Sequence, residues 1–297
     1  MTIETPAGTP AKIPVWKTTL ECYRLTFRNL GDLLRFSWPW LLLLIAVSGA
    51  LYWGFWETEQ EALKTSGGSN VLMLLTLIVS TSIGAFIAVP WHRLLLLGEK
   101  QDLATGMKIG TKHRPYLLWA LLLGVLPMVP LLALASLFPW GPASSETELM
   151  TVSEMNAIMA LISGILIFVA MSLFTTRLAL ILPATAVGHS GVDWREAWAI
   201  TRGNTWRLFW ASVIIILPLM IFYIFVTPHD VSASAAPATI AEADELARRI
   251  TFTLWSMLEE LLAMFTGMVL VAFLSLAYRH FTGLPDPEST SATPPAP

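Results

Sequence analysis

Six long stretches of apolar residues follow one another along the chain, with shorter polar segments between them. A helix needs roughly 20 apolar residues to cross a hydrocarbon layer about 30 Å thick, because in lipid it must satisfy its own backbone polar groups. The pattern therefore predicts membrane-spanning helices at residues 36–56, 71–97, 116–138, 155–182, 206–226 and 254–281. Several prolines fall inside these runs, but none of the six is expected to be clearly broken.

The amino-acid composition supports this interpretation and removes one class of partner. Hydrophobic residues make up 55% of the 297 positions and charged residues 13%, against about 25% charged residues in soluble domains. We therefore expect an all-α membrane protein. The net charge of −3 provides no general attraction for nucleic acid, and the single cysteine, Cys22, allows no internal disulfide.

The distribution of basic residues predicts the orientation of the spans. Of the eighteen Lys and Arg residues, fifteen fall in the terminal segments and in the loops on the same side of the membrane. The other three loops hold only Lys64, Arg248 and Arg249. Short loops rich in Lys and Arg stay in the cytosol, so we expect a bacterial inner-membrane protein with both termini cytoplasmic.

Two of the cytosolic segments look like copies of each other. Aligning residues 108–128 with residues 199–219 places Trp119 on Trp210 and Pro127 on Pro218. The N-terminal segment fits the same plan more loosely. The sequence thus predicts three repeats, each a cytosolic amphipathic helix followed by two spans. The units are about 14–98, 99–188 and 189–284, in one membrane domain, 14–284, between a disordered N-terminus, 1–13, and a disordered tail, 285–297.

The stretch GVDWREAWAITRGNTWRLFW, residues 191–210, predicts an amphipathic helix in detail. Asp193 and Glu196 resemble a capping box, and residues from Trp194 to Thr201 then recur at helical spacing on one face, with arginines on the other. Gly203 and the following asparagine end the helix. Such a helix is expected to lie in the headgroup plane, with its tryptophans toward lipid and its cations toward phosphates.

The N-terminal segment has the same amphipathic pattern, whereas the pattern in the middle copy, around residues 103–109, is weaker. Trp16, Leu20, Tyr23 and Phe27 share one face of the N-terminal helix, and Lys17 lies among the cations on the rest. In addition, each even-numbered span ends in an arginine on the cytosolic side. The predicted contacts with anionic lipid headgroups, or with another membrane protein, are Arg24, Arg28, Arg93, Arg177, Trp194, Arg195, Trp198, Arg202, Arg207 and Arg279.

The segments RLALILPATAV, WREAWAITRGNTWRLFW and LSLAYRHFTG carry a family resemblance. They are similar to prokaryotic membrane proteins grouped with the membrane domain of glycerophosphoryl diester phosphodiesterases and with the YciC-like proteins. The resemblance covers residues 177–226 and 270–283. It implies an all-helical membrane domain, which in that group is sometimes fused to a phosphodiesterase. No soluble catalytic domain is present in this chain, so the resemblance does not imply that activity.

Ionisable residues are scarce in the predicted spans. A charge in hydrocarbon costs at least ~2.5 kcal/mol, so such residues usually mark transport paths. Glu259 and Glu260 are the nearest case, about one turn into the last span. Paired carboxylates bind cations, but a place at the water boundary, facing Arg248, Arg249 or solvent, fits their position better.

The sequence contains no recognisable catalytic or metal-binding set. The five histidines have no metal-ligand spacing, and one cysteine cannot complete a zinc site. GHSG at residues 188–191 resembles a nucleophile elbow, but its second glycine comes one residue too early. We therefore expect no catalytic residue, no cofactor and no metal, and an enzyme acting through His92, His189 or Ser190 ranks last among the hypotheses.

Small residues at four-residue spacing are found within the even-numbered spans. They let helix backbones approach closely, so spans two, four and six are expected at the centre of the bundle. A groove or pore lined by such residues is the alternative. The predicted packing residues are Ser80, Gly84, Ala88, Ala160, Gly164, Ala263 and Gly267.

Two functions from different classes remain open at this point. The first is a non-enzymatic protein that organises or senses membrane lipid, or a partner complex, through its cationic, tryptophan-bearing interfacial helices. The second is a transporter or channel for a lipid or a neutral small solute, because internal repeats are common in transporters. Its path would pass Ser80, Ser163, Thr175, Thr176 and Ser275.

Overall fold

The computed structural model describes residues 12–55, 70–100, 102–103, 110–137, 149–189, 193–226 and 241–285, and these residues form helices and connecting turns without a strand. The helices are α1 (Val15–Arg28), α2 (Leu30–Gly54), α4 (Asn70–Leu97), α6 (His113–Val125), α7 (Met128–Leu137), α8 (Leu149–Leu178), α9 (Ile181–Val187), α10 (Trp194–Ile200), α11 (Thr205–Val226) and α12 (Ala241–Thr282). The expected all-α class is confirmed.

Five helices are long and apolar enough to cross a membrane, and they overlap five of the six predicted spans. The candidate segments are Leu30–Gly54, Leu74–Leu97, Leu161–Val187, Thr205–Tyr223 and Glu245–Thr282. The protein is thus compatible with integration into a membrane. The third predicted span, 116–138, is not one of them.

The third predicted span is divided into α6 and α7, so the expectation that no span is broken was wrong. Leu126 and Pro127 form a turn between the two helices. Proline has no N–H to donate and its ring clashes with the carbonyl four residues earlier, which explains the break. Pro130 lies in the first turn of α7, where a missing N–H costs little. With 13 and 10 residues, α6 and α7 are about 20 and 15 Å long, and neither alone spans a bilayer.

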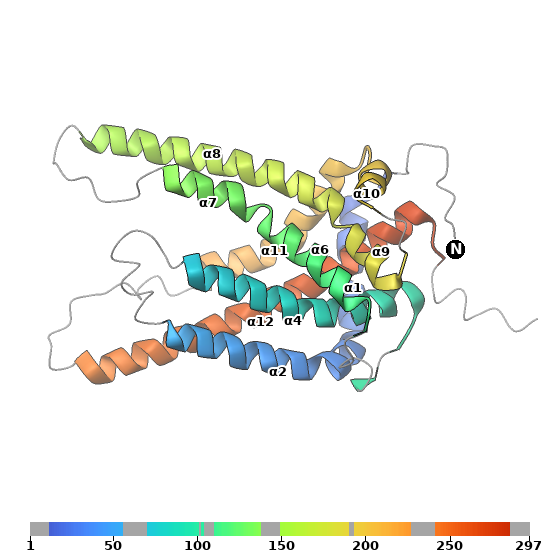
Figure 1. Cartoon of the computed structure of the whole chain (residues 1–297), viewed down its shortest axis with the longest axis horizontal. Helices are drawn as coiled ribbons and strands as arrows, with labels where there is room; N and C mark the ends of the chain where they lie inside the picture. Colours follow the sequence, from blue (N-terminus) through green and yellow to red (C-terminus); the bar gives the residue numbers. More distant parts are fainter. Residues whose placement is uncertain are drawn as a thin grey trace, which may run out of the picture.

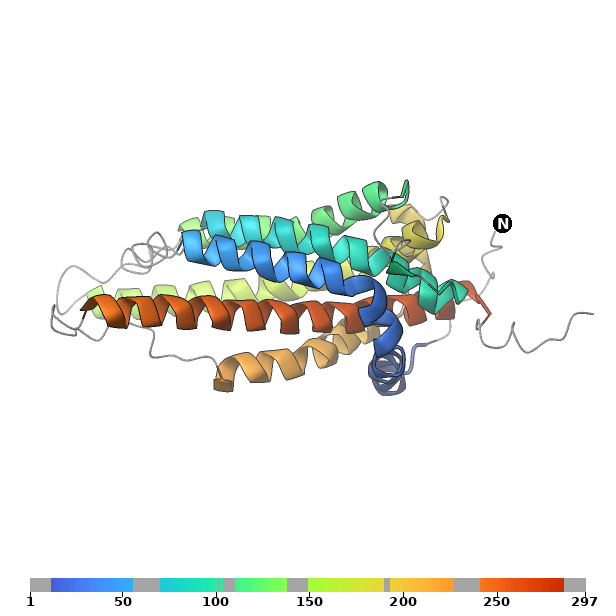
Figure 2. The ribbon, with the colours of Figure 1, turned by 90° about the horizontal axis from the view of Figure 1, so that it is seen from below.

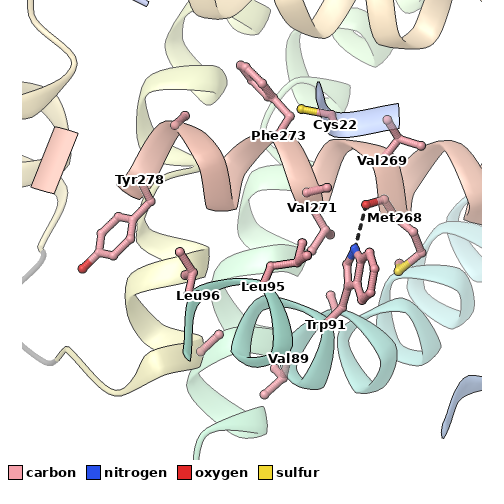
Figure 3. Close-up of a cluster of buried hydrophobic side chains, with 14 of the residues drawn as sticks. Cys22, Val89, Trp91, Leu95, Leu96, Met268, Val269, Val271, Phe273 and Tyr278 are labelled. Carbon is pink, nitrogen blue, oxygen red and sulfur yellow. Dashed lines mark hydrogen bonds between the residues drawn. The ribbon is translucent and has the colours of Figure 1, made fainter. Parts of the chain in front are cut away.

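The core of the bundle is formed by α2, α4 and α12, which pack against one another in every pairing. Helix α12 runs along the whole bundle (Figure 2). Trp91 of α4 is fully buried, and its indole N–H donates to the carbonyl of Met268 in α12, at 3.0 Å. Figure 3 shows this bond, with Cys22 of α1 lying over Val269 and Phe273 of α12.

Central packing was correctly expected for α4 and α12 but not for α8. Helix α8 packs against α7, α10 and α11, and a broad face of its middle part is exposed, from Ile158 to Phe168. Helix α2 takes the central place instead. Its Gly49 lies directly against the side chain of Met257 in α12, and this close approach was not anticipated from the sequence.

The predicted packing residues have mixed positions. Ser80 and Gly84 of α4 face α12, and Ala88 is buried. Gly164 approaches Leu134 of α7. In contrast, Ala263 is exposed and a Cβ at Gly267 would meet nothing within 4 Å, so neither lies at a close helix contact. The side chain of Ala160 lies outside the described residues.

Short helices gather at one end of the bundle, which we call the proximal end. Helices α1, α9 and α10 lie there together with the final turns of α4 and α12 (Figure 1). Helix α1 runs across the bundle rather than along it (Figures 1 and 2). The opposite end, where α2 and α11 finish, is called the distal end. By the predicted orientation, the proximal end is cytosolic.

Some expectations about segments lie outside the described residues. Residues 1–11 and 286–297 hold most of the two tails expected to be disordered, and residues 104–109 hold most of the middle amphipathic helix. The threefold repeat therefore remains a prediction. Ile13, however, falls in the tail expected to be disordered but is buried, and its N–H donates to Asn204 Oδ1 at 3.0 Å.

Candidate functional site at the proximal end

Helix α1 presents three different strips along its length. The strip that packs into the bundle is made of small side chains, Thr19, Cys22 and Thr26, all buried. The apolar strip, by contrast, is on the outside: Trp16 is 65% exposed and Phe27 is 59% exposed. The expected helix is confirmed, and the structure adds that its tryptophan-bearing face points away from the protein.

The third strip of α1 carries charge. Lys17, Arg24 and Arg28 are exposed, and at about 100° per residue they follow one another beside the apolar strip. Glu21, which is half-buried, is the one acidic residue of the helix. Large apolar side chains flanked by cations are the surface that an interfacial helix presents to headgroups and the upper acyl chains.

Two hydrogen bonds, one from the middle of α1 and one before it, hold α1 across the bundle. The hydroxyl of Tyr23 donates to the carbonyl of Ile215 in α11, at 2.8 Å. Before the helix, the carbonyl of Ile13 accepts from Arg207 Nη1 at 2.9 Å. Because these hydrogen bonds use one tyrosine and the backbone before the helix, the apolar side chains of Trp16 and Leu20 remain on the surface.

Burial also changes the acid–base properties of the α1 face that packs inward. Desolvation raises the pKa of the Cys22 thiol, with the neighbouring Glu21 carboxylate adding to the effect. Desolvation likewise raises the pKa of Tyr23. Both side chains are therefore neutral at physiological pH, which suits their contacts with the apolar core.

Helix α10 begins as the sequence predicted. The carboxylate of Asp193 accepts from the N–H groups of Arg195 and Glu196, both at 2.9 Å. Trp194 is exposed by about half, and Trp198 is also exposed. The turn after α10 includes Gly203 at φ +82°, a left-handed conformation that glycine adopts without the cost paid by other residues.

Four of the arginines predicted to contact headgroups or a partner donate to backbone carbonyls, three of them at helix ends. Arg93 binds the carbonyl of Ala186 at the end of α9, at 3.2 Å. Arg177 binds that of Trp198 near the end of α10, at 2.5 Å, and lies 3.5 Å above its ring. Arg279 binds the carbonyl of Leu95 in the last turn of α4. The fourth, Arg207, holds the backbone before α1.

The last carbonyls of a helix have no partner within it and carry partial negative charge, so guanidinium groups are suitable partners. The three contacts also follow an order. Arg93 of the first predicted repeat binds a carbonyl of the second repeat, and Arg177 of the second repeat binds a carbonyl of the third. Arg279 of the third repeat binds a carbonyl of the first. Arg93 is further held by a bidentate contact with Glu99, at 2.7 and 2.8 Å.

The remaining predicted contacts lie on the surface of the proximal end. Arg24 and Arg28 belong to α1, and Arg195 and Arg202 belong to α10 and the turn after it, and all four are exposed. Arg195 lies 5.2 Å from the ring centre of Trp194. With Lys17 they form a cationic surface beside exposed tryptophans. Headgroup or partner binding by these side chains remains a prediction.

The structure also forms three long-range polar pairs that the sequence did not connect. Glu260 of α12 is hydrogen-bonded to the hydroxyl of Ser80 in α4, and Glu260 is only 9% exposed. The expectation that Glu260 faces Arg248, Arg249 or solvent was therefore wrong, because α4 covers it. Glu259 instead accepts from the indole N–H of Trp255 one turn earlier, at 2.6 Å.

The other two pairs involve histidines near the proximal end. His92 of α4 is fully buried, with Nδ1 2.7 Å from the hydroxyl of Ser275 in α12. His189 Nδ1 lies 2.8 Å from the hydroxyl of Tyr278, also in α12. These pairs are long-range contacts, and a sequence pattern carries no signal for them.

The hydrogen bonds of the described residues do not join the polar residues of the proposed transport path to one another. The hydroxyls of Thr175 and Thr176 donate to carbonyls within α8 itself. Ser275 is paired with His92, and Ser80 is paired with Glu260. Within the described part of the chain, no group of three or more His, Cys, Asp and Glu side chains is placed to hold a metal ion. Ser190 lies outside that part.

Comparisons with protein-family models, with curated proteins and with solved structures give no match to this chain. The function therefore has to be argued from the residues and their geometry.

Proposed function

We propose that this chain is a non-enzymatic integral protein of a bacterial inner membrane. In this proposal it binds anionic lipid headgroups at its cytosolic surface through α1, with α10 as a second contact. The resemblance to the membrane domain of glycerophosphoryl diester phosphodiesterases agrees with an all-helical membrane domain, without adding an activity.

The observation that carries the proposal is the division of α1 into three strips. A helix that served only to pack against the bundle would bury its large apolar side chains, yet here Trp16, Leu20 and Phe27 are outside and the small residues are inside. The three cations beside the apolar strip add attraction to an anionic surface, roughly 1 kcal/mol for each charge near it. The proximal location of α1 fits the cytosolic leaflet under the positive-inside rule.

The experiment compares two changes of opposite sign on α1. The protein is reconstituted in nanodiscs containing phosphatidylglycerol and phosphatidylcholine in equal amounts, and the lipids retained are counted by native mass spectrometry. Replacing Lys17, Arg24 and Arg28 by glutamine should lower the preference for phosphatidylglycerol, by up to about 100-fold if each charge contributes about 1 kcal/mol. The matched control Glu21→Gln should raise it by about fivefold.

Two outcomes would oppose the proposal. An unchanged lipid preference in the triple variant would show that α1 does not select anionic headgroups. A change of equal sign in the triple and Glu21→Gln variants would show that the effect is not electrostatic. If a co-purified protein is lost from the triple variant while its lipid preference is unchanged, the surface binds a partner complex rather than lipid.

A second candidate function is transport of a lipid or a neutral small solute. The observation in its favour is the break at Leu126 and Pro127, because interrupted membrane helices are frequent at transport sites. Uptake by proteoliposomes above that of empty vesicles, lost when Pro127→Ala joins α6 to α7, would support it. Uptake equal to that of empty vesicles over a broad solute panel would exclude it.

A further inference from the structure

Glu260 lies on a buried polar strip of α12. Thr253, Ser256 and Glu260 recur at three- and four-residue spacing, which places them on one face of the helix, and all three are buried. Arg249, one turn further toward the distal end, continues the same face. The strip therefore leads from the distal end of the bundle to the carboxyl group of Glu260.

Aromatic side chains mark the level of the distal membrane surface. Trp255 of α12 stacks on Phe222 of α11, with ring centres 5.8 Å apart. Tyr223 of α11 and Trp53 of α2 lie in the final turns of their helices, and Trp and Tyr prefer the headgroup level. Glu260 comes five residues after Trp255, so it lies about 7 Å deeper along the helix.

The hydrogen bonds of Ser80 indicate which form of Glu260 fits. The Ser80 hydroxyl has one proton, but it contacts two acceptors, the carbonyl of Thr76 at 2.8 Å and Oε1 of Glu260. If Glu260 is a carboxylate, these two oxygens compete for that proton. If Glu260 is a carboxylic acid, its own O–H donates to Ser80 and Ser80 donates to Thr76, and every proton has one acceptor.

The described surroundings of Glu260 contain no cation placed as a counterion. Residues 70–91 of α4 include no ionisable side chain, α9 has none, residues 36–54 of α2 contribute only Tyr52, and residues 208–226 of α11 contribute only Tyr223. Helix α1 meets α12 nearby through Phe27 and Phe265, while its charged groups, Lys17, Glu21, Arg24 and Arg28, belong to the surface strip. On α12 itself, Glu259 binds Trp255, Arg249 binds the carbonyl of Trp53, and Arg248 lies beside Glu245.

We propose that Glu260 is a proton-binding site within the membrane. It carries a proton at neutral pH while α4 and α12 are packed together, and it exchanges that proton with water at the distal end along Thr253 and Ser256. In the exchange the carboxyl O–H bond breaks, the electron pair stays on the carboxylate, and the proton passes to water. The site is independent of lipid binding by α1, so either proposal can fail alone.

Labelling with dicyclohexylcarbodiimide tests the protonation directly. This apolar reagent enters from the membrane and reacts with a protonated carboxylic acid, and mass spectrometry of the protein in liposomes locates the adduct. At pH 7 we expect an adduct on Glu260, whereas an ordinary glutamate, with a pKa of about 4.3, is almost wholly ionised at this pH and does not react. Glu260→Gln should abolish the adduct, and the matched control Glu259→Gln should leave it unchanged. Slower labelling in the presence of sodium ions at constant pH would overturn the proposal in favour of a cation site.

Infrared spectroscopy provides a measurement that does not depend on access of the reagent. A buried carboxylic acid has a carbonyl stretch above the amide band, and this band should be present at pH 7 in the wild-type protein and in Glu259→Gln. It should be missing in Glu260→Gln, whose neutral amide has nearly the same shape and preserves packing. A wild-type spectrum at pH 7 without an acid band that depends on Glu260 would show a carboxylate and overturn the proposal.

Discussion

Arg279→Gln is expected to loosen the proximal end of the bundle. Arg279 is in the last turn of α12, and its guanidinium donates to the carbonyl of Leu95 in the last turn of α4. That carbonyl has no later N–H of α4 to bind, because the helix ends at Leu97. Glutamine is shorter and uncharged, so the substitution removes both the hydrogen bond and the favourable charge at the helix end.

The magnitude follows from these two contributions. A hydrogen bond to a charged group contributes about 1.5–3 kcal/mol when its partner is left unsatisfied. A cation at a helix C-terminus contributes about 0.3–1 kcal/mol more. Since Arg279 is half-buried rather than fully buried, we take the lower part of the range. The expected loss in the free energy of unfolding is about 2 kcal/mol, which corresponds to about a 30-fold change in an equilibrium constant.

Cys22 makes the assay simple. It is the single cysteine of the chain, it is fully buried between α1 and α12, and burial raises the pKa of its thiol. A thiol reagent therefore reacts only when the inward face of α1 is exposed, and in denaturant just below the unfolding midpoint the main route to that exposure is unfolding of the whole bundle. Under conditions where reclosing is faster than labelling, the labelling rate reports the opening equilibrium, and Arg279→Gln should raise it by about 30-fold.

The control is Arg202→Gln, which removes a positive charge from an exposed side chain at the same end. It should change the opening free energy by no more than about 0.5 kcal/mol. Labelling of Arg279→Gln within about threefold of wild type would refute the argument that this arginine holds α4 and α12 together.

Two further predictions concern α10. Gly203→Ala should destabilise the protein by about 1 kcal/mol, because a Cβ there would meet no atom within 4 Å and only the left-handed backbone opposes it. The control Gly31→Ala, in a helix and equally unobstructed, should not destabilise the protein, and thermal unfolding compares the two variants. Arg177→Gln should increase hydrogen exchange of the α10 amides by about tenfold or more, because it removes the bond to the carbonyl of Trp198 and the contact with the Trp198 ring. The control Arg195→Gln should leave the α10 amides protected, and equal exchange in both variants would contradict the role of Arg177.

Much of the fold could be predicted because membrane helices leave a strong local signal. Length and apolarity located five long helices, and the Asp193 cap and Gly203 turn defined α10 closely. The break at Pro127 was missed because the same signal, a proline in an apolar run, is found within continuous α2, α4 and α11. What distinguishes Pro127 locally is a second proline three residues later.

The candidate site was only partly predictable, because sequence spacing reports which face of a helix a residue occupies but not what covers that face. For α1 the spacing separated the apolar residues from the cationic ones, but it did not identify the strip of small residues, and the direction of each strip depends on the hydrogen bonds made by Tyr23 and Ile13. For the span-end arginines the sequence indicated a common position but not the carbonyls they bind. Glu260 shows the same limit, since only its contact with Ser80 of a distant helix reveals that it is buried.

A depth measurement tests whether α1 lies in the membrane surface with its apolar strip toward lipid. Spin labels are placed at Leu20→Cys and Arg28→Cys in a Cys22→Ser background, and the protein is reconstituted in liposomes containing phosphatidylglycerol. We expect the label at position 20 to be reached by oxygen dissolved in lipid and to lie about 5–10 Å below the phosphates, while the label at position 28 is reached by a water-soluble nickel complex. Equal access of the nickel complex to both positions would place α1 in water and rule out this placement.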